Sequence, residues 1–142
     1  MSLEIEQKER EGIVVLELHG RLIVGEPVAE LRERITRLCE AGTKNILLNM
    51  VGVDYIDSTG LGGMVISYTS LKKAGGVVKL MNVSKRNIEL LVLTKLTTVF
   101  ELFEDEQDAV NSFFPNREIR KFDILEFVRQ QDKAEEADAE KG

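Results

Sequence analysis

Segments with the periodicity of strands alternate with segments of helical periodicity along most of this chain. The first clear strand is 13–18, which is rich in β-branched residues, and apolar residues then recur at helical spacing over 27–38 until Gly42. A nearly continuous apolar run at 45–51 is typical of a strand buried on both faces of a sheet. Such alternation predicts an α/β fold in which right-handed crossovers join mainly parallel strands and helices pack on the sheet.

The alternation continues to about residue 114. The elements predicted there are a helix over 61–74, a strand over 77–81, a helix over 84–96, an edge strand over 99–103 and a helix over 104–114 that Pro115 ends. A weaker strand at 3–8 precedes a turn and forms a hairpin with 13–18. We therefore predict a single α/β domain with a mixed, mainly parallel sheet of four to five strands and about four helices.

The C-terminal part of the chain differs from the rest. At 142 residues the chain is about one domain long, and the predicted domain spans 3–114. In 115–130 apolar residues recur every three positions, which predicts an amphipathic helix that either packs on the domain or forms a homodimer contact. In 131–142 five acids stand against two lysines, and we expect this acidic tail to be disordered.

Charge and residue counts exclude several classes of protein. A net charge of -6 repels phosphate backbones and anionic lipid, so we expect neither nucleic acid nor a membrane surface as a partner. No apolar run approaches the roughly 18 residues of a membrane span, and the N-terminus lacks a signal-peptide pattern, which predicts a cytoplasmic protein. Because Cys39 and His19 are the only residues of their types, we predict no disulfide, no structural zinc site and no cofactor.

The segment 54–63 joins the buried strand to the next helix and carries two hydroxyls, Ser58 and Thr59, at the predicted helix N-terminus. Unpaired backbone N–H groups and the helix dipole favour an anion there. Gly60, Gly62 and Gly63 would let the backbone of a partner come close. The alternative interpretation is that a hydroxyl simply caps the helix and that the glycines permit tight packing. Local chemistry leaves both interpretations open.

Known catalytic motifs do not fit this segment. A Walker loop requires Gly-Lys-Ser or Gly-Lys-Thr, which the sequence lacks, and a dinucleotide-binding fingerprint requires glycine or alanine where Val65 stands. A nucleophile elbow requires glycine at the position of Ile56. Strand alternation places His19, the one candidate base, on the same face as Glu17, where a polar histidine at a strand end is expected. The sequence therefore predicts that the chain is not an enzyme.

Four segments carry a resemblance to a known family. They are Tyr-Ile-Asp-Ser-Thr-Gly-Leu-Gly at 55–62, Ile-Leu-Leu-Asn at 46–49, the two glycines and strand at 75–81, and Asn-Val-Ser at 82–84. In their order along the chain they resemble the STAS domain of bacterial anti-sigma factor antagonists, over about 3–114. The resemblance implies a STAS-like fold for this part of the chain.

The resemblance also implies a function. In that family the unphosphorylated antagonist binds an anti-sigma factor that is also a serine/threonine kinase, and so releases a sigma factor. The kinase phosphorylates the antagonist to free itself, and a PP2C-type phosphatase reverses the reaction. Carried over, Ser58 is the phosphorylation site and Thr59 a lesser candidate. The implied partner-binding residues are Asp57, Ser58, Thr59, Gly60, Leu61 and Gly62.

Two points remain open at this stage. Many members of the family have an acidic residue shortly after the Gly-x-Leu that ends the second strand, whereas this chain continues from Leu22 as Ile-Val-Gly, so contacts near the nucleotide of a kinase are expected to differ. The docking surface could also include the apolar helix 88–93, through Leu90 or Leu93. The alternative function is that of a STAS scaffold subunit in a sensory complex or in lipid-transport machinery.

Overall fold

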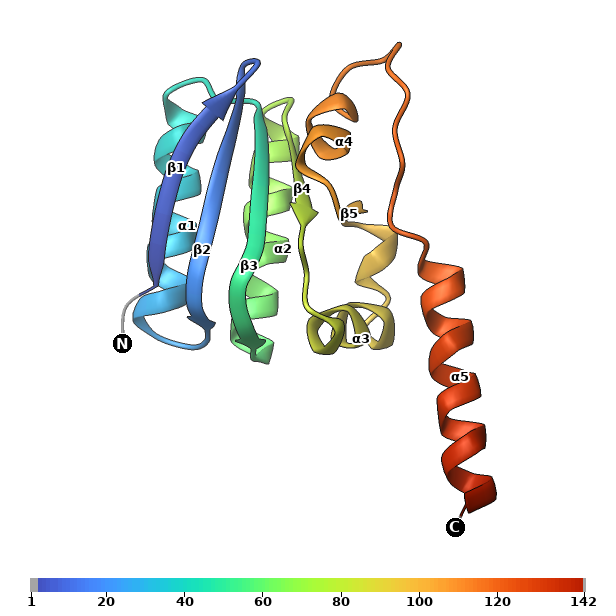
Figure 1. Cartoon of the computed structure of the whole chain (residues 1–142). Coiled ribbons are helices and arrows are strands. Elements are labelled where there is room, and N and C mark those ends of the chain that lie inside the picture. The colour runs from blue at the N-terminus through green and yellow to red at the C-terminus, as the bar shows by residue number, and fades with distance from the viewer. Residues whose placement is uncertain (1–2, 142) are drawn as a thin grey trace.

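The computed structural model describes residues 3–141, and the side chains of residues 3–135. Along the chain the elements are β1 (Glu4–Arg10), β2 (Ile13–Leu22), α1 (Glu26–Glu40), β3 (Asn45–Ile56), α2 (Ser58–Lys73), β4 (Val77–Met81), α3 (Lys85–Leu93), the 3-10 helix η1 (Leu96–Thr98), β5 (Leu102–Phe103), α4 (Glu106–Asn111) and α5 (Ile124–Lys141). The strands form one sheet in the order β1-β2-β3-β4-β5 (Figure 1). β1 is antiparallel to β2, and the other neighbours are parallel. The predicted mixed, mainly parallel α/β fold is confirmed.

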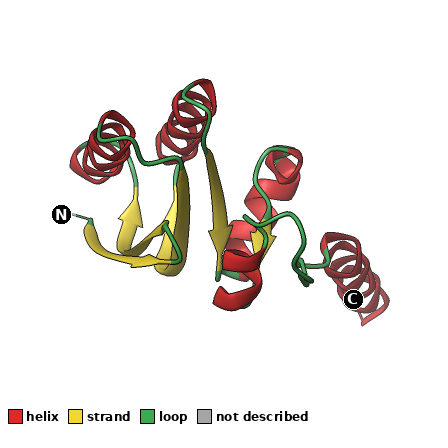
Figure 2. Cartoon of the chain, turned by 90° about the horizontal axis from the view of Figure 1, so that it is seen from above, coloured by secondary structure: helices red, strands yellow, loops and turns green. Residues whose placement is uncertain are grey.

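The main hydrophobic core lies between the sheet and helices α1 and α2, which cover the same face (Figure 2). Successive side chains of a strand point to opposite faces. Val14 and Leu16 of β2 therefore belong to this core, whereas Ile13 and Val15 belong to a second cluster on the other face. The nearly continuous apolar runs of β2 and β3 follow from this burial on both sides.

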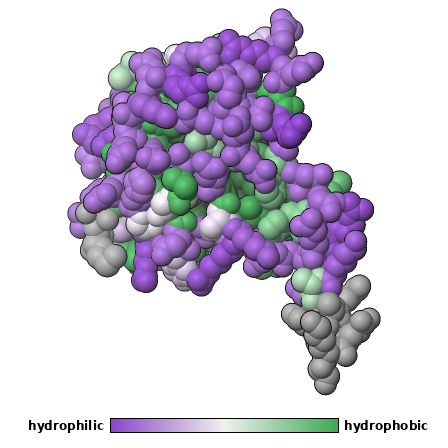
Figure 3. Space-filling view, in the orientation of Figure 1, coloured by the Kyte–Doolittle hydropathy of each residue, from purple (hydrophilic) through white to green (hydrophobic). Residues whose placement is uncertain are grey.

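Helix α4 covers only part of that second face. The smaller cluster beneath it consists of Ile13, Val15, Leu47, Met81, Phe103, Ala109 and Val110. Two ion pairs hold α4 to the edge strand, because Glu106 Oε1 lies 2.9 Å from Lys8 Nζ and Glu106 Oε2 lies 2.5 Å from Arg10 Nη1. The remainder of this face is open to solvent, and hydrophobic residues appear there among hydrophilic ones (Figure 3).

Strand β3 is longer than the sequence predicts. It runs on to Ile56, so residues 54–56 belong to the strand and not to the loop. The reason is tertiary, because β2 also continues to Leu22, which lies opposite Ile56 in the parallel pairing. The junction with α2 is thereby reduced to Asp57 alone.

The region between α3 and α4 is less regular than predicted. Lys95 adopts a left-handed conformation with φ of 62°, and η1 follows it, so only Leu102–Phe103 remains of the predicted edge strand 99–103. Helix α4 begins after Asp105, whose carboxylate accepts a hydrogen bond of 3.0 Å from the backbone N–H of Asp108. It is therefore shorter than the predicted helix 104–114.

The C-terminal segment forms helix α5, which begins at Ile124 and not near Ile119. Phe122 and Phe127 pack against the main core, so the start of this helix lies in cis on the domain. The helix continues to Lys141 where the sequence predicts a disordered tail, because the alanines, glutamates and lysines of this stretch have high helix propensity. None of the described helices is both long and apolar enough to cross a lipid bilayer.

Candidate functional site

The junction of β3 with α2 lies beside the loop that joins β2 to α1, and Asp57 connects the two. Its Oδ1 accepts a hydrogen bond of 2.7 Å from the backbone N–H of Gly60, and its Oδ2 accepts one of 2.9 Å from the backbone N–H of Val24. Its own backbone N–H donates to the carbonyl oxygen of Leu22 at 3.2 Å. Asp57 is therefore the N-cap of α2 and also fixes the neighbouring loop.

These contacts keep Asp57 ionised. The backbone N–H groups of Gly60 and Val24 donate to the carboxylate, and they hold the pKa of Asp57 below its ordinary value. A carboxylate with both oxygens engaged is a fixed negative charge at the end of the sheet. Its contribution here is to position the first turn of α2.

Ser58 and Thr59 are the first two residues of α2, and both are exposed. Neither hydroxyl forms a hydrogen bond to any other described residue, because Asp57 already supplies the cap. The sequence-based alternative that Ser58 or Thr59 caps the helix is therefore wrong. What remains at this position is a solvent-accessible hydroxyl at a helix N-terminus.

The glycines after these hydroxyls have different roles. A Cβ atom at Gly60 would lie 2.0 Å from the carbonyl oxygen of Leu22, and one at Gly63 would lie 2.7 Å from Cγ1 of Val28. Both glycines are buried where α2 packs closely on its neighbours, so the expectation that Gly60 and Gly63 let a partner approach is wrong. Gly62 is exposed, and a Cβ atom there would meet nothing within 4 Å.

Of the six residues predicted for partner binding, Ser58, Thr59 and Gly62 lie on the surface, while Asp57 is half-buried. Gly60 is buried, and Leu61 is only 8% exposed and belongs to the main core. These two residues shape the site from within.

Two exposed apolar side chains on the elements that meet at Asp57 were not predicted from the sequence. Val24 follows β2 and is 64% exposed, and Ile66 of α2 is 47% exposed. Ile66 lies on the same side of α2 as Ser58 and Gly62, because residues four positions apart share a helix face. The signals were an isoleucine outside the apolar spacing of α2 and a valine next to a loop glycine.

Helix α3 was expected to contribute Leu90 or Leu93 to the surface. Leu93 is 81% exposed, whereas Leu90 is partly buried against the core. His19, as predicted, shares a face with Glu17, and its Nε2 lies 3.3 Å from Glu17 Oε2.

A sheet of this topology with a capped, hydroxyl-bearing helix start after its third strand is the arrangement of a STAS domain. The STAS domain family matches residues 4–109, and the chain belongs to this family. Among curated relatives, the anti-sigma-B factor antagonist of Bacillus subtilis (strain 168) is 32% identical over 111 residues, which is 78% of this chain and 99% of the relative. The anti-sigma-B factor antagonist of Staphylococcus aureus (strain NCTC 8325 / PS 47) is 32% identical over 104 residues, which is 73% of this chain and 95% of the relative.

Solved structures share the fold. The structure of TM1081 from Thermotoga maritima has a TM-score of 0.71 at 22% identity, and the alignment covers 76% of this chain and 92% of that one. The Bacillus cell fate determinant SpoIIAA in its phosphorylated form has a TM-score of 0.61 at 21% identity, and the alignment covers 78% of this chain and 98% of that one.

Proposed function

We propose that this chain is an anti-sigma factor antagonist that binds its anti-sigma factor through the surface around Ser58 and is released when Ser58 is phosphorylated. The observation that carries the proposal is the exposed Ser58 hydroxyl at the start of α2, where Asp57 has taken over the capping. The two curated relatives named anti-sigma-B factor antagonist support the choice of partner. A hydroxyl with no structural duty is available to a kinase.

The switch acts through charge. A phosphate on Ser58 adds about -1.5 to -2 charges at neutral pH, next to the ionised Asp57. The backbone N–H groups at the start of α2 and the helix dipole tolerate this charge. The fold therefore persists, and the change is confined to the surface that a partner would contact.

The charge of a phosphate on Ser58 is large enough to weaken partner binding strongly. Two negative charges about 6 Å from one partner carboxylate, at an effective dielectric constant of about 40, repel it by on the order of 3 kcal/mol. This corresponds to a loss of affinity of roughly a hundredfold. Such a loss separates a bound state from a free one at ordinary cellular concentrations.

The proposed cycle involves two enzymes and takes place in the cytoplasm. The anti-sigma factor is itself a serine/threonine kinase that phosphorylates Ser58, and a PP2C-type phosphatase removes the phosphate. The antagonist supplies no catalysis of its own, and neither nucleic acid nor a membrane takes part. Exposed Val24 and Ile66 would supply the apolar part of the contact.

The test compares Ser58→Ala, Ser58→Asp and a matched Thr59→Ala variant with the cognate anti-sigma factor kinase. We expect the kinase to phosphorylate wild type and Thr59→Ala but not Ser58→Ala, with the phosphate mapped by mass spectrometry. Ser58→Ala should bind the kinase constitutively, and Ser58→Asp, which adds one negative charge and not two, should bind roughly tenfold more weakly. Phosphate on Thr59 alone, or equal binding by the two Ser58 variants, would overturn the proposal.

A second function, that of a scaffold subunit, is supported by a different observation. Leu125 on α5 and Leu93 at the end of α3 are 83% and 81% exposed. Leu93 lines a pocket together with Val92, Phe127 and Val128, and contiguous exposed apolar surface marks interaction sites. Light scattering decides between the two functions, because a scaffold forms a large homo-oligomer, while an antagonist remains a monomer or dimer.

A further inference from the structure

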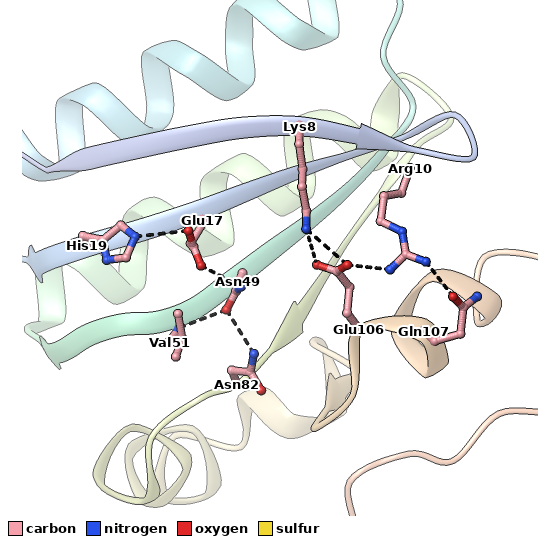
Figure 4. Close-up of polar contacts among 9 residues, drawn as sticks. All are labelled: Lys8, Arg10, Glu17, His19, Asn49, Val51, Asn82, Glu106 and Gln107. Atoms are coloured by element: carbon pink, nitrogen blue, oxygen red, sulfur yellow. Dashed lines mark hydrogen bonds and ion pairs between the residues drawn. The ribbon is translucent and has the colours of Figure 1, made fainter.

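The part of the sheet face that α4 leaves open carries a group of metal-binding side chains from β1 and β2. Glu6 and Glu17 lie directly opposite each other in the antiparallel pairing of these strands. His19 follows Glu17 on the same face (Figure 4). No metal site was expected from the sequence, because the chain has one histidine. The pairing of β1 with β2, however, brings the carboxylates of Glu6 and Glu17 close to that histidine.

The distances between these groups suit a transition-metal ion. One ligand atom from each of Glu6, Glu17 and His19 lies within 4.8 Å of the other two. Zinc binds nitrogen and oxygen at about 2.0–2.2 Å, so two ligand atoms of a tetrahedral ion lie about 3.4 Å apart. The separation of His19 Nε2 from Glu17 Oε2 is 3.3 Å. Only a small movement of Glu6 would complete three protein ligands.

The backbone makes room for the imidazole. The pairing of β2 with β3 shifts register between Glu17 and His19, so that His19 lies opposite Gly52. Such irregularities re-aim side chains. A Cβ atom at Gly52 would lie 2.3 Å from His19 Nδ1, so only glycine leaves space for the ring in this position. The ring therefore rests against β3 with its Nε2 directed at Glu17.

A buried side chain orients the second ligand. Asn49 is 8% exposed, and its Oδ1 accepts hydrogen bonds from the backbone N–H of Val51 at 3.1 Å and from Asn82 Nδ2 at 3.2 Å. This fixes the amide so that Asn49 Nδ2 faces Glu17 Oε1 at 3.4 Å (Figure 4). Polar groups that hold a ligating carboxylate in this way are a regular part of metal sites.

The local charge also favours a cation. Both carboxylates line a pocket of about 270 Å³, together with Gln7, Lys8 and Asn49. Lys8 is the nearby cation, but its Nζ is paired with Glu106 at 2.9 Å. Two facing carboxylates repel each other, and a divalent ion between them removes that repulsion.

We propose that Glu6, Glu17 and His19 bind a divalent transition-metal ion such as Zn²⁺, with a fourth position open to water or to a donor group of a partner. The imidazole favours such an ion over Mg²⁺ or Ca²⁺, which prefer oxygen ligands. The site is independent of the proposed role of Ser58. It lies on the sheet face opposite α1 and α2, because Glu17 and His19 continue the alternation of Ile13 and Val15 along β2.

His19 makes the test direct, because it is the only histidine of the chain. The full chain, with no polyhistidine tag, is titrated with Zn²⁺ while the ring resonances of His19 are followed by NMR and the affinity is measured by calorimetry. We expect saturable binding of one ion with a shift of the His19 resonances, and no such shift with Mg²⁺. Absence of binding at millimolar Zn²⁺ would overturn the proposal.

Matched variants locate the ion. Glu6→Gln, Glu17→Gln and His19→Gln should each raise the dissociation constant for Zn²⁺ by about tenfold or more. Glu9→Gln, an exposed change on the other face of β1, and Cys39→Ser should leave it unchanged. Equal affinity in all five variants would show that the ion binds elsewhere and would also overturn the proposal. Phosphorylation of Ser58 by the kinase is measured in the same variants and should be unchanged in all of them. A failure of the metal proposal can therefore be told apart from a failure of the proposed function.

Discussion

Asp57 couples the start of α2 to the loop after β2 through both of its carboxylate oxygens. Because the backbone N–H groups of Gly60 and Val24 stabilise its charged form, the pKa of Asp57 in the folded chain lies below the ordinary value of 3.8. A group of this kind stabilises the fold at pH values above its unfolded pKa. The contribution is lost as the pH falls through the folded pKa.

Replacing Asp57 by alanine should therefore lower the urea midpoint at neutral pH. The difference from wild type should shrink as the pH falls below about 4, since protonation then weakens the same contacts in the wild type. Urea unfolding over a pH series measures this, with Asp54→Ala as the control, because Asp54 is exposed and its carboxylate forms no hydrogen bond to a described residue. A difference that stays constant into strong acid would contradict the assigned role of the carboxylate.

Gly60 and Gly62 are two glycines of α2 at which alanine should have opposite effects on stability. A methyl group at Gly60 would overlap the carbonyl oxygen of Leu22, whereas the same group at Gly62 meets open space. We expect Gly60→Ala to reduce the free energy of unfolding by about 1–3 kcal/mol. Gly62→Ala should be neutral or stabilise by up to about 1 kcal/mol, because alanine favours the helix. Urea unfolding of both variants checks this, and equal effects would mean that the close approach is absent.

At the scale of elements, periodicity predicted best those segments that face a single core. Helix α1 was predicted closely because its apolar residues recur at helical spacing and Gly42, with φ of 97°, can adopt the conformation that ends it. Strand β5 and helix α4 were predicted too long, because a left-handed residue, Lys95, and a capping residue, Asp105, decide where they begin. Local pattern does not reveal these choices, since many polar residues can fill either role.

The candidate site was also predicted only in part from the sequence. The strand-to-helix junction and the hydroxyls of Ser58 and Thr59 followed from sequence. The identity of the cap did not, because aspartate, serine and threonine all cap helices well. The burial of Gly60 and the exposure of Val24 depend on how far β2 extends beside β3, which is a property of the tertiary structure.

Helix α5 and the residues before it pack against the edge of the sheet. The backbone N–H of Phe122 donates to the carbonyl oxygen of Leu102 at 3.0 Å, and the Phe122 and Phe127 rings lie 5.8 Å apart, so this segment covers the β5 edge of the sheet. Phe127→Ala should reduce the free energy of unfolding by roughly 1–3 kcal/mol, less than a fully buried phenylalanine. Leu125→Ala, at a position 83% exposed, should change it by less than about 0.5 kcal/mol.

Denaturation by urea measures both variants. If the two changes have equal effects, α5 does not pack on the domain through Phe127. Phosphorylation of Ser58 should be the same in both, since the helix start at Ser58 and the segment after Pro115 use different parts of the sheet. The two measurements together separate the stability of the C-terminal segment from the function of the site.

For the whole molecule, the central question is how far the effect of a phosphate on Ser58 spreads. The first turn of α2 accepts negative charge, and its packing rests on Gly60, Gly63 and Leu61, none of which requires the serine hydroxyl. The one contact expected to change is that of Asp57 with Val24, because two negative groups now lie side by side. We expect the packing of the core between the sheet and its helices to stay the same.

We therefore expect the amide NMR spectra of phosphorylated and unphosphorylated chain to differ at 57–63 and at Val24, and to agree at residues such as Leu16 and Leu47 in the centre of the sheet. The Val24 amide is the sensitive reporter, because its proton is donated to the carboxylate next to the phosphate. Asp57→Asn removes the charge and leaves one acceptor oxygen for the two N–H donors, so the shift of Val24 on phosphorylation should be reduced. Shifts spread across the sheet, or a Val24 amide that does not respond to the phosphate, would contradict the proposal that phosphorylation acts by placing a charge on a fixed surface.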